Sequence, residues 1–403
     1  MKITLFVGEL FSSSTTFIIR KVKALAERGE SVTVITSGRL QNKAHEEILA
    51  GVKNIHVISI PADKGTPLHR FFVGVWLLIK ALLKSPKDTY QFGRIALQYD
   101  AWAPRLKSMR KLLGLAGLRS DVYHFEFGDI AVQHLDYLKF KARPCIVSFR
   151  GADIDIYPLV HEELKLSYRQ VIEHADRIHC VSQATAHQVA QLGDPRKIFI
   201  NRPSIYASFF RPTSFSKKYP AIIVSVARLK WKKGLTYALL AVAQLVTEFP
   251  DLRYIIIGEG PSKDELMFYA ADLGIQNHVE FFGRASEESV KETLDRASVF
   301  LLASLEEGIS NAVLEAMAME VPVVTTDAGG MAEAVTDGVE GFVVPRYDPG
   351  ALAARTRQLL QDDDLRKRMG QNARQRVLRD FTIERQVQMF LDEYYALNKP
   401  EKS

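Results

Sequence analysis

Short apolar runs alternate with longer amphipathic segments along most of the chain, and this pattern predicts an α/β protein. Strand-like runs in the first half lie at residues 2–7, 31–36, 122–125, 145–149 and 177–181. Amphipathic helices such as 17–28 and 182–192 separate them, and a second block of the same kind begins near Ala221. The order of these elements predicts two doubly wound sheets facing each other across a cleft.

The length of the chain also favours two domains, because 403 residues exceed what one hydrophobic core usually serves. Residues 209–220, with two prolines and several serines and lysines, are the best linker candidate. The two cysteines, Cys145 and Cys180, lie in apolar runs without metal-ligand spacing, so we expect reduced thiols and a cytoplasmic location. We expect no signal peptide and no membrane-spanning segment, since the apolar start breaks at Gly8 and no run reaches ~18 apolar residues.

Two glutamates, Glu307 and Glu315, flank the start of a predicted helix that follows the strand-like run 299–303 and ends before Pro322. The first N–H groups of a helix lack partners and carry partial positive charge, which suits a diphosphate. Carboxylates beside an anion would repel it unless they served something else, and sugar or ribose hydroxyls are suitable donors. The pair therefore predicts a sugar-nucleotide site, with ordinary solvated charges as the alternative.

The residues around the pair strengthen this interpretation. The run 315–318 reads Glu-Ala-Met-Ala, and it is followed by Pro-Val-Val at 322–324, Gly-Gly at 329–330 and two further glycines. This stretch resembles the C-terminal signature of the family 4 retaining glycosyltransferases. The resemblance implies that Glu307 holds the donor sugar and Glu315 the ribose. It also implies that the helix start binds the diphosphate, through Gly308, Ser310, Asn311 and Ala312.

The same resemblance implies the GT-B architecture, which consists of two Rossmann-like domains. An acceptor domain is expected at residues 1–210 and a nucleotide-sugar domain at 211–382. A final helix at about 383–398 is expected to pack back on the first domain.

A cluster of four cations follows the strand-like run 221–226, at the strand end where open α/β sheets bind ligands. It resembles the family's R-L-x-x-x-K-G motif, which implies that Arg228 and Lys233 bind the donor diphosphate. For Lys230 and Lys232, a solvated basic turn remains the alternative.

Two weaker motifs lie further along the second half. The turn at Gly258 resembles the family's I-x-G-x-G-P element and lacks the glycine spacing of a P-loop or dinucleotide fingerprint. Arg284 ends a strand that resembles the element bordering the nucleotide base. Turn chemistry and surface charge are the respective alternatives.

The first half departs more from the family pattern. Residues 12–17, in the loop that begins at Gly8, resemble the S-S-E-T-F entry of exopolysaccharide glycosyltransferases, with Thr15 in place of the acid. Hydroxyl and N–H groups of such a loop would meet the donor diphosphate, and ordinary helix caps are the alternative. Arg150 replaces the histidine of an F-H-G-x-D element, and Glu126 replaces the second histidine of H-x-H-F-G. An arginine cannot act as a base at neutral pH, so we expect Arg150 to stabilise departing phosphate or to bind an acidic sugar.

Metal and nucleic acid are not expected as ligands. The pair Asp153 and Asp155 has the D-x-D spacing of another glycosyltransferase fold, but Asp153 already matches a non-metal element and the basic cluster can neutralise a diphosphate. Asp362–Asp364 reads more simply as a capped helix start. No nucleic-acid recognition motif accompanies the basic residues.

Positive charge gathers between residues 64 and 119, where eleven cations accompany two acids, Asp88 and Asp100. Aromatic and aliphatic residues interleave with the cations, as in amphipathic regions that bind anionic membranes. Helices packed on their own sheet with a solvated basic face are an equally weighted alternative.

Together these features predict a retaining, metal-independent glycosyltransferase without a cofactor. It would transfer a hexosyl unit from a UDP- or GDP-sugar to a glycan or lipid-linked glycan of a bacterial surface polysaccharide, in the cytoplasm or at the inner membrane face. Two alternatives are a sugar-nucleotide 2-epimerase, which would use the same cleft without an acceptor, and an inactive sugar-nucleotide-binding partner subunit, which we would expect to lack part of the intact set Arg228, Lys233, Glu307 and Glu315. Oligomeric state is left open.

Overall fold

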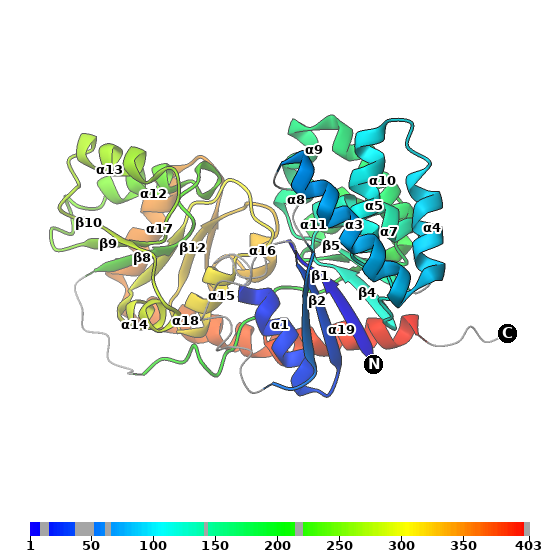
Figure 1. Ribbon diagram of the computed structural model, residues 1–403. Coiled ribbons are helices and arrows are strands. Elements are labelled where there is room, and N and C mark those ends of the chain that lie inside the picture. Colours follow the sequence, from blue (N-terminus) through cyan, green and yellow to red (C-terminus); the bar gives the residue numbers. More distant parts are fainter. Residues whose placement is uncertain (9–15, 37–51, 61–65, 141–143, 214–220, 399–403) are drawn as a thin grey trace.

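The computed structural model describes residues 1–8, 16–36, 52–60, 66–140, 144–213 and 221–398. It contains two parallel sheets in separate domains, with helices on both faces of each sheet (Figure 1). This is the predicted architecture of two doubly wound domains, and its two sheets have seven and six strands in the described residues. Most of the predicted linker, residues 214–220, lies outside these ranges.

The first sheet has the strand order β3-β2-β1-β4-β5-β6-β7, and all its pairings are parallel. Its strands are β1 (Lys2–Phe6), β2 (Ser31–Thr36), β3 (Ile55–Ser59), β4 (Val122–Phe125), β5 (Cys145–Phe149), β6 (Arg177–Cys180) and β7 (Ile198–Ile200). The five predicted strands are present, and the two edge strands were missed. β7 is only three residues long, and β3 has no buried residue, so neither gives a strong strand pattern.

The second sheet has the order β10-β9-β8-β11-β12-β13 and is also parallel. Its strands are β8 (Ile222–Val226), β9 (Arg253–Ile257), β10 (Val279–Gly283), β11 (Val299–Leu302), β12 (Val323–Thr326) and β13 (Gly341–Val344). In both sheets the inner strands are buried on both faces, which explains their continuous apolar runs.

Helices cover the two sheets. Those of the first domain are α1 (Thr16–Glu27), α3 (Pro67–Lys84), α4 (Pro86–Ala96), α5 (Trp102–Leu113), α6 (Gly128–Gln133), α7 (Leu135–Phe140), α8 (Ala152–Asp155), α9 (Tyr157–Val160), α10 (Glu162–His174) and α11 (Gln183–Ala190). Those that follow are α12 (Leu235–Ala243), α13 (Lys263–Asp272), α14 (Glu287–Arg296), α15 (Asn311–Ala318), α16 (Met331–Ala334), α17 (Pro349–Gln361), α18 (Asp363–Asp380) and α19 (Ile383–Leu397). As predicted from Asp362–Asp364, α18 has a capped start, because the Asp362 side chain accepts a hydrogen bond from Leu365 N at 2.8 Å.

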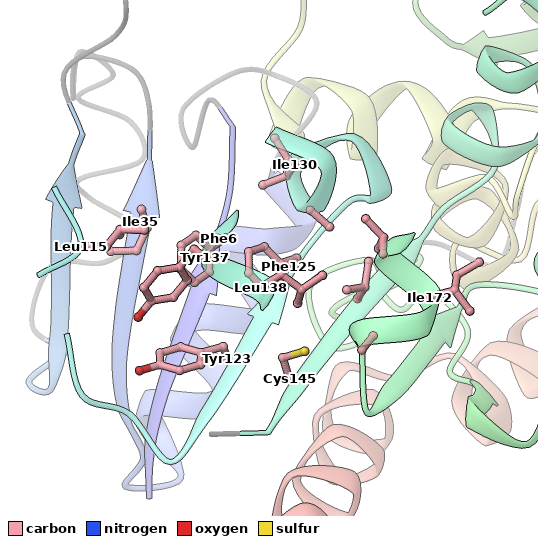
Figure 2. Packing of buried hydrophobic residues seen from close by; sticks show 14 of the residues in the cluster. Phe6, Ile35, Leu115, Tyr123, Phe125, Ile130, Tyr137, Leu138, Cys145 and Ile172 are labelled. Carbon is pink, nitrogen blue, oxygen red and sulfur yellow. The ribbon is translucent and has the colours of Figure 1, made fainter. Parts of the chain in front are cut away.

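Aromatic side chains fill the core between the first sheet and its helices (Figure 2). Phe6 of β1 stacks on Phe125 of β4 with ring centroids 4.4 Å apart, and Tyr137 of α7 packs against the same cluster. Cys145 and Cys180 are buried and are not joined by a disulfide. The core therefore holds the carboxyl ends of β4 and β5, which carry Glu126 and Arg150, in fixed positions.

The last helix, α19, returns to the first domain, as Figure 1 shows. Its buried residues Ile383, Val387, Phe390 and Tyr394 share a core cluster with the first sheet and α1. The chain thus crosses between the domains twice. In the part of the chain that the structure describes, no helix combines the length and apolar character needed to cross a membrane.

Candidate active site

The predicted donor residues come from two neighbouring strands. β8 pairs with β11, so the basic turn after β8 lies beside the loop that leads from β11 into α15. Lys233 Nζ forms an ion pair with the carboxylate of Glu307, and Lys232 Nζ lies 2.8 Å from Glu306 Oε2. The structure therefore brings Lys233 and Glu307, from two separate sequence motifs, into direct contact.

Two glycines fix this arrangement of the loops. Gly234 has φ +59°, and a Cβ built on it would lie 1.9 Å from Ala303 O. Gly329 has φ +53°, and its Cβ would lie 1.7 Å from Glu307 O. Any side chain at either position would force the backbone apart, so both glycines permit the close approach that places Glu307.

The start of α15 has no side-chain cap. The helix begins at Asn311, close to the predicted position, with Ser310 as its N-cap residue. The Ser310 side chain makes no capping hydrogen bond, so the first N–H groups keep their capacity to bind oxygen atoms. Asn311 Oδ1 is buried without a hydrogen-bond partner among the described residues. Gly308 and Ala312 lie on the same segment, and diphosphate binding by these residues stays a prediction.

Glu315 lies one turn further along α15 and faces the first domain. Its carboxylate lies 3.7 Å from the guanidinium of Arg20 in α1, and Arg20 also binds Glu287 Oε1 at 2.5 Å. Burial raises the pKa of Glu315 to about 7; the charge of Arg20 opposes this shift and that of Glu287 adds to it. The ionised form of Glu315 thus depends on a residue of the other domain.

Arg228 stands at the end of β8 with an exposed side chain. Its turn rests on the loop at Gly258, since Leu229 N donates to Glu259 O at 3.0 Å. A Cβ on Gly258, which has φ +139°, would lie 1.9 Å from Ala227 O. Gly258 therefore supports the Arg228 turn by close backbone packing.

Arg284 lies at the same end of the sheet, on the turn after β10. Its guanidinium lies 3.9 Å from Glu259, and its side chain is 67 % exposed. A contact with the nucleotide base stays a prediction for this residue.

The first domain faces these loops with Gly8 and Arg150. Gly8 O accepts a hydrogen bond from Thr36 Oγ1 at 2.9 Å, and the predicted serine-rich loop after it, residues 9–15, lies outside the described residues. The backbone at Arg150 abuts the donor loop, because a Cβ on Gly308 would lie 2.9 Å from Arg150 O. Gly8 and Arg150 therefore both lie at the strand ends that face the second domain.

The guanidinium of Arg150 is engaged by Glu126. It forms an ion pair with the Glu126 carboxylate, donates from Nε to Glu126 O at 2.9 Å, and lies over the ring of Phe17 at 4.6 Å. Glu126 is fully buried and also binds Lys21 Nζ at 2.6 Å. The two residues that replace the family's histidines thus form one charge pair, with Lys21 as a third member.

This buried trio was missed from the sequence. Burial alone would raise the pKa of Glu126. The charges of Lys21 and Arg150 outweigh burial and hold this pKa well below its ordinary value. Burial lowers the pKa of Lys21 to about 8, although Glu126 opposes the shift. Glu126 and Arg150 were marked in the sequence by their departure from the family motifs. The signal for Lys21 was its place beside Arg20, where the two cations interrupt an apolar helix face.

Glu333 of α16 is a second residue whose role was not predicted. Its carboxylate accepts hydrogen bonds from Gln183 N and Ala184 N, at 2.6 and 3.2 Å, at the start of α11 in the first domain. It also pairs with Arg202 at 2.8 Å. Glu333 therefore joins the two domains beside the site.

The Asp153 carboxylate acts as a backbone acceptor. It accepts hydrogen bonds from Arg150 N at 2.8 Å and Gly128 N at 3.3 Å. Burial raises the pKa values of Asp153 and Asp155 to about 7, which disfavours their charged forms. Within the described ranges, no cluster of three metal-ligating side chains occurs.

Comparison with known proteins agrees with this geometry. Residues 208–376 match the family model for glycosyl transferases group 1. The chain is 29 % identical over 384 residues to the amylovoran biosynthesis glycosyltransferase AmsK of Erwinia amylovora, covering 90 % of this chain and 91 % of that protein. It is 33 % identical over 399 residues to the putative colanic acid biosynthesis glycosyltransferase WcaL of Escherichia coli (strain K12), covering 94 % and 96 %.

Solved structures share the whole fold. HepE of Anabaena, determined with UDP and glucose, superimposes with a TM-score of 0.75 at 17 % identity and covers 98 % of this chain and 100 % of its own. A glycosyltransferase from Rickettsia africae gives a TM-score of 0.74 at 18 % identity and covers 99 % of both chains. These neighbours agree with the predicted GT-B fold, and the full-length similarity to WcaL shows that the chain belongs to the group 1 glycosyltransferases.

Proposed function

We propose that this glycosyltransferase moves a hexosyl unit from a nucleoside diphosphate sugar to a hydroxyl of a glycan or lipid-linked glycan in bacterial surface polysaccharide biosynthesis. The observation that carries the proposal is the contact between Lys233 and Glu307. Arg228 lies on the same basic turn as Lys233, and the uncapped start of α15 follows the loop that carries Glu307. This group offers cations and N–H donors for a diphosphate, and a carboxylate for sugar hydroxyls.

The chemical difficulty in the transfer is the negative charge of the departing diphosphate. The bond from sugar C1 to the diphosphate oxygen breaks, the acceptor oxygen bonds to C1, and the acceptor proton passes to the departing diphosphate. Arg228, Lys233 and the first N–H groups of α15 would stabilise the developing charge. In the structure Lys233 pairs with Glu307. In the complex Lys233 would contact both Glu307 and the diphosphate, and the second carboxylate oxygen of Glu307 would accept hydrogen bonds from sugar hydroxyls.

The nucleotide would lie towards Glu315. Its carboxylate is one helical turn from the diphosphate site and is the right kind of acceptor for two ribose hydroxyls. Support for a UDP-sugar donor comes from HepE, which was solved with UDP and glucose. Retention at C1, family 4 membership and catalysis without metal or cofactor are parts of the proposal. GDP-sugars remain donors to be tested beside UDP-sugars.

The acceptor is proposed to be a surface glycan intermediate, on the strength of relatives named for amylovoran and colanic acid biosynthesis. We place the reaction in the cytoplasm, at the inner face of the cell membrane, where a lipid-linked acceptor would be held. Support comes from the basic, apolar-rich region 64–119, whose first residue, Lys64, lies outside the described residues.

A panel of UDP- and GDP-sugars tests the proposal, with calorimetry for binding and product analysis for slow hydrolysis. We expect one class of donor to bind saturably and to release its sugar, and Lys233→Ala to lose the hydrolysis. Lys367→Ala, on the exposed surface of α18, is the matched control. Formation of a C2-epimeric sugar without acceptor would favour an epimerase, and binding without any turnover an inactive subunit. Absence of all binding would overturn the donor site itself.

A further inference from the structure

One helix of the first domain carries apolar residues on its outer face as well as its inner face. The inner face of α3 packs Leu77 and Ala81 into the domain core. The outer face exposes a stripe that repeats every three or four positions, formed by Leu68, Phe71, Phe72, Val75, Trp76, Ile79, Leu82 and Leu83. Phe71 is 64 % and Leu83 is 85 % exposed. A solvent-facing helix surface normally carries polar residues, so this stripe indicates an interaction surface.

The helices α4 and α5, which pack against α3, also expose apolar residues. Tyr90 of α4 and Trp102 and Leu106 of α5 are exposed, as is Leu97, which follows α4. In Figure 1, α3 lies on the near side of the first domain, and α4 lies at its edge away from the second domain. The docking face, defined as the exposed residues of α3, α4 and α5, therefore belongs wholly to the first domain, whereas the loops that carry Lys233 and Glu307 belong to the second.

The docking face is strongly basic. Lys80, Lys84, Lys87, Arg94 and Lys107 are all exposed on these three helices. Of the two acids between residues 66 and 119, Asp88 is buried and bound to Arg119 at 2.8 Å, which leaves Asp100 as the exposed one. Lys80 Nζ lies 4.9 Å from the ring centroid of Trp76, so cations and aromatic rings share one surface.

We propose that this face docks on the surface of an anionic lipid bilayer, with α3 lying in the plane of the headgroups. Large apolar side chains flanked by lysines match a layer in which acyl chains lie beneath negative headgroups. A second copy of this chain is a poorer partner, because a symmetric contact would place the same cations opposite one another. The positive charge of the docking face favours a negatively charged partner, and its long apolar stripe favours a partner into which apolar side chains can insert, as they can into a bilayer.

Docking through this face would provide the membrane contact included in the proposed function, and it can be tested separately from the sugar transfer. The contact would be made by the stripe of α3 and by the surrounding lysines. We also predict that α3 remains at the interface and does not span the bilayer.

Flotation of the purified full-length protein with vesicles tests the proposal. We expect binding to phosphatidylcholine vesicles that contain about 30 % phosphatidylglycerol, and weak binding to phosphatidylcholine alone, because each cation near the surface contributes roughly a fivefold gain in affinity. The variant Phe71→Ser/Phe72→Ser/Trp76→Ser should lower binding at least about tenfold, through lost apolar insertion. Lys80→Glu/Lys84→Glu should abolish the preference for anionic vesicles.

Matched controls lie on other surfaces. Phe268→Ser of α13 removes an aromatic side chain that is 71 % exposed. Lys367→Glu/Arg368→Glu of α18 reverses two exposed charges. Both control variants should bind vesicles like the wild type. All variants should hydrolyse a soluble donor at the wild-type rate, which separates loss of docking from loss of the active site. Equal binding by the triple variant and the wild type would overturn the proposal. So would a dimer that the triple variant abolishes, in a protein that ignores vesicles.

Discussion

The guanidinium of Arg20 in the first domain lies 3.7 Å from the carboxylate of Glu315 in the second. The same guanidinium binds Glu287, so one buried arginine holds two glutamates across the domain boundary. Glu315 is also the residue expected to accept the ribose hydroxyls. The contact therefore links docking of the domains to the charge state of a residue that we predict to bind the donor.

The pH dependence of nucleotide binding should reveal this link. Burial raises the pKa of Glu315 to about 7, and its ionised form is the better hydrogen-bond acceptor. Affinity for a nucleoside diphosphate should thus rise with pH through about 7. Arg20→Ala removes the charge that opposes the shift, so the midpoint should move to higher pH. Calorimetric titration across about pH 6 to 9 measures it. The control Arg28→Ala, directly after the same helix, should leave the midpoint unchanged. An unchanged midpoint in Arg20→Ala would show that Arg20 does not control the ionisation of Glu315.

The cations of the basic turn should contribute mainly to turnover. Arg228→Ala and Lys233→Ala should each lower kcat by roughly 10²-fold or more, because charge on the leaving diphosphate would lose a stabilising partner. Steady-state kinetics with the preferred donor measures the effect. Lys230→Ala, in the same turn, is the matched control and should stay near the wild-type rate. Wild-type rates in both test variants would remove the diphosphate assignment.

Buried charges in the first domain should control stability. Glu126→Gln leaves Lys21 and Arg150 without their shared counter-ion, which should cost roughly 3 to 5 kcal/mol in the free energy of unfolding. Adding Lys21→Met to that variant should recover part of the loss, since one uncompensated charge is removed. Urea unfolding measures both effects. Glu248→Gln, which breaks a half-exposed ion pair with Arg357, should cost no more than about 1 kcal/mol. Equal costs for Glu126→Gln and Glu248→Gln would contradict the role of burial.

Much of the fold could be predicted from local patterns of apolar and polar residues. Buried parallel strands have continuous apolar runs, so the inner strands were predictable, and adjacent strands in such sheets bring their following loops together. That relation explains why Lys233 and Glu307, which belong to two separate motifs and lie 74 residues apart, meet in the fold. Arg20 binds Glu287 of the other domain, 267 residues along the chain, and Lys21 binds Glu126 from within a helix, 105 residues along the chain. No local pattern encodes those contacts, because they depend on how the domains and strand ends pack.

Metal independence is a further prediction. Arg228, Lys233 and the start of α15 can neutralise the donor diphosphate without a divalent ion. Treatment with excess EDTA should therefore leave the rate of donor turnover unchanged. Complete loss that Mn²⁺ or Mg²⁺ restores would instead favour Asp153 and Asp155 as ligands. If a metal were needed, Asp155→Asn would lose activity. If the enzyme is metal-independent, as we predict, Asp155→Asn should retain activity.

The two glutamates of the donor site should separate by role. If Glu315 binds the ribose, Glu315→Ala should weaken binding of the free nucleoside diphosphate, because a hydrogen bond to a charged acceptor contributes roughly 1.5 to 3 kcal/mol. Glu307→Ala should leave that affinity nearly unchanged and lower turnover of the intact donor, since its contact lies on the transferred sugar. Calorimetry with the diphosphate and kinetics with the sugar nucleotide measure the two halves. Glu306→Ala tests whether loop shape alone matters, as Glu306 pairs with Lys232 beside the site. Equal loss of diphosphate affinity in Glu307→Ala and Glu315→Ala would mean that both residues serve the nucleotide or only maintain the loop.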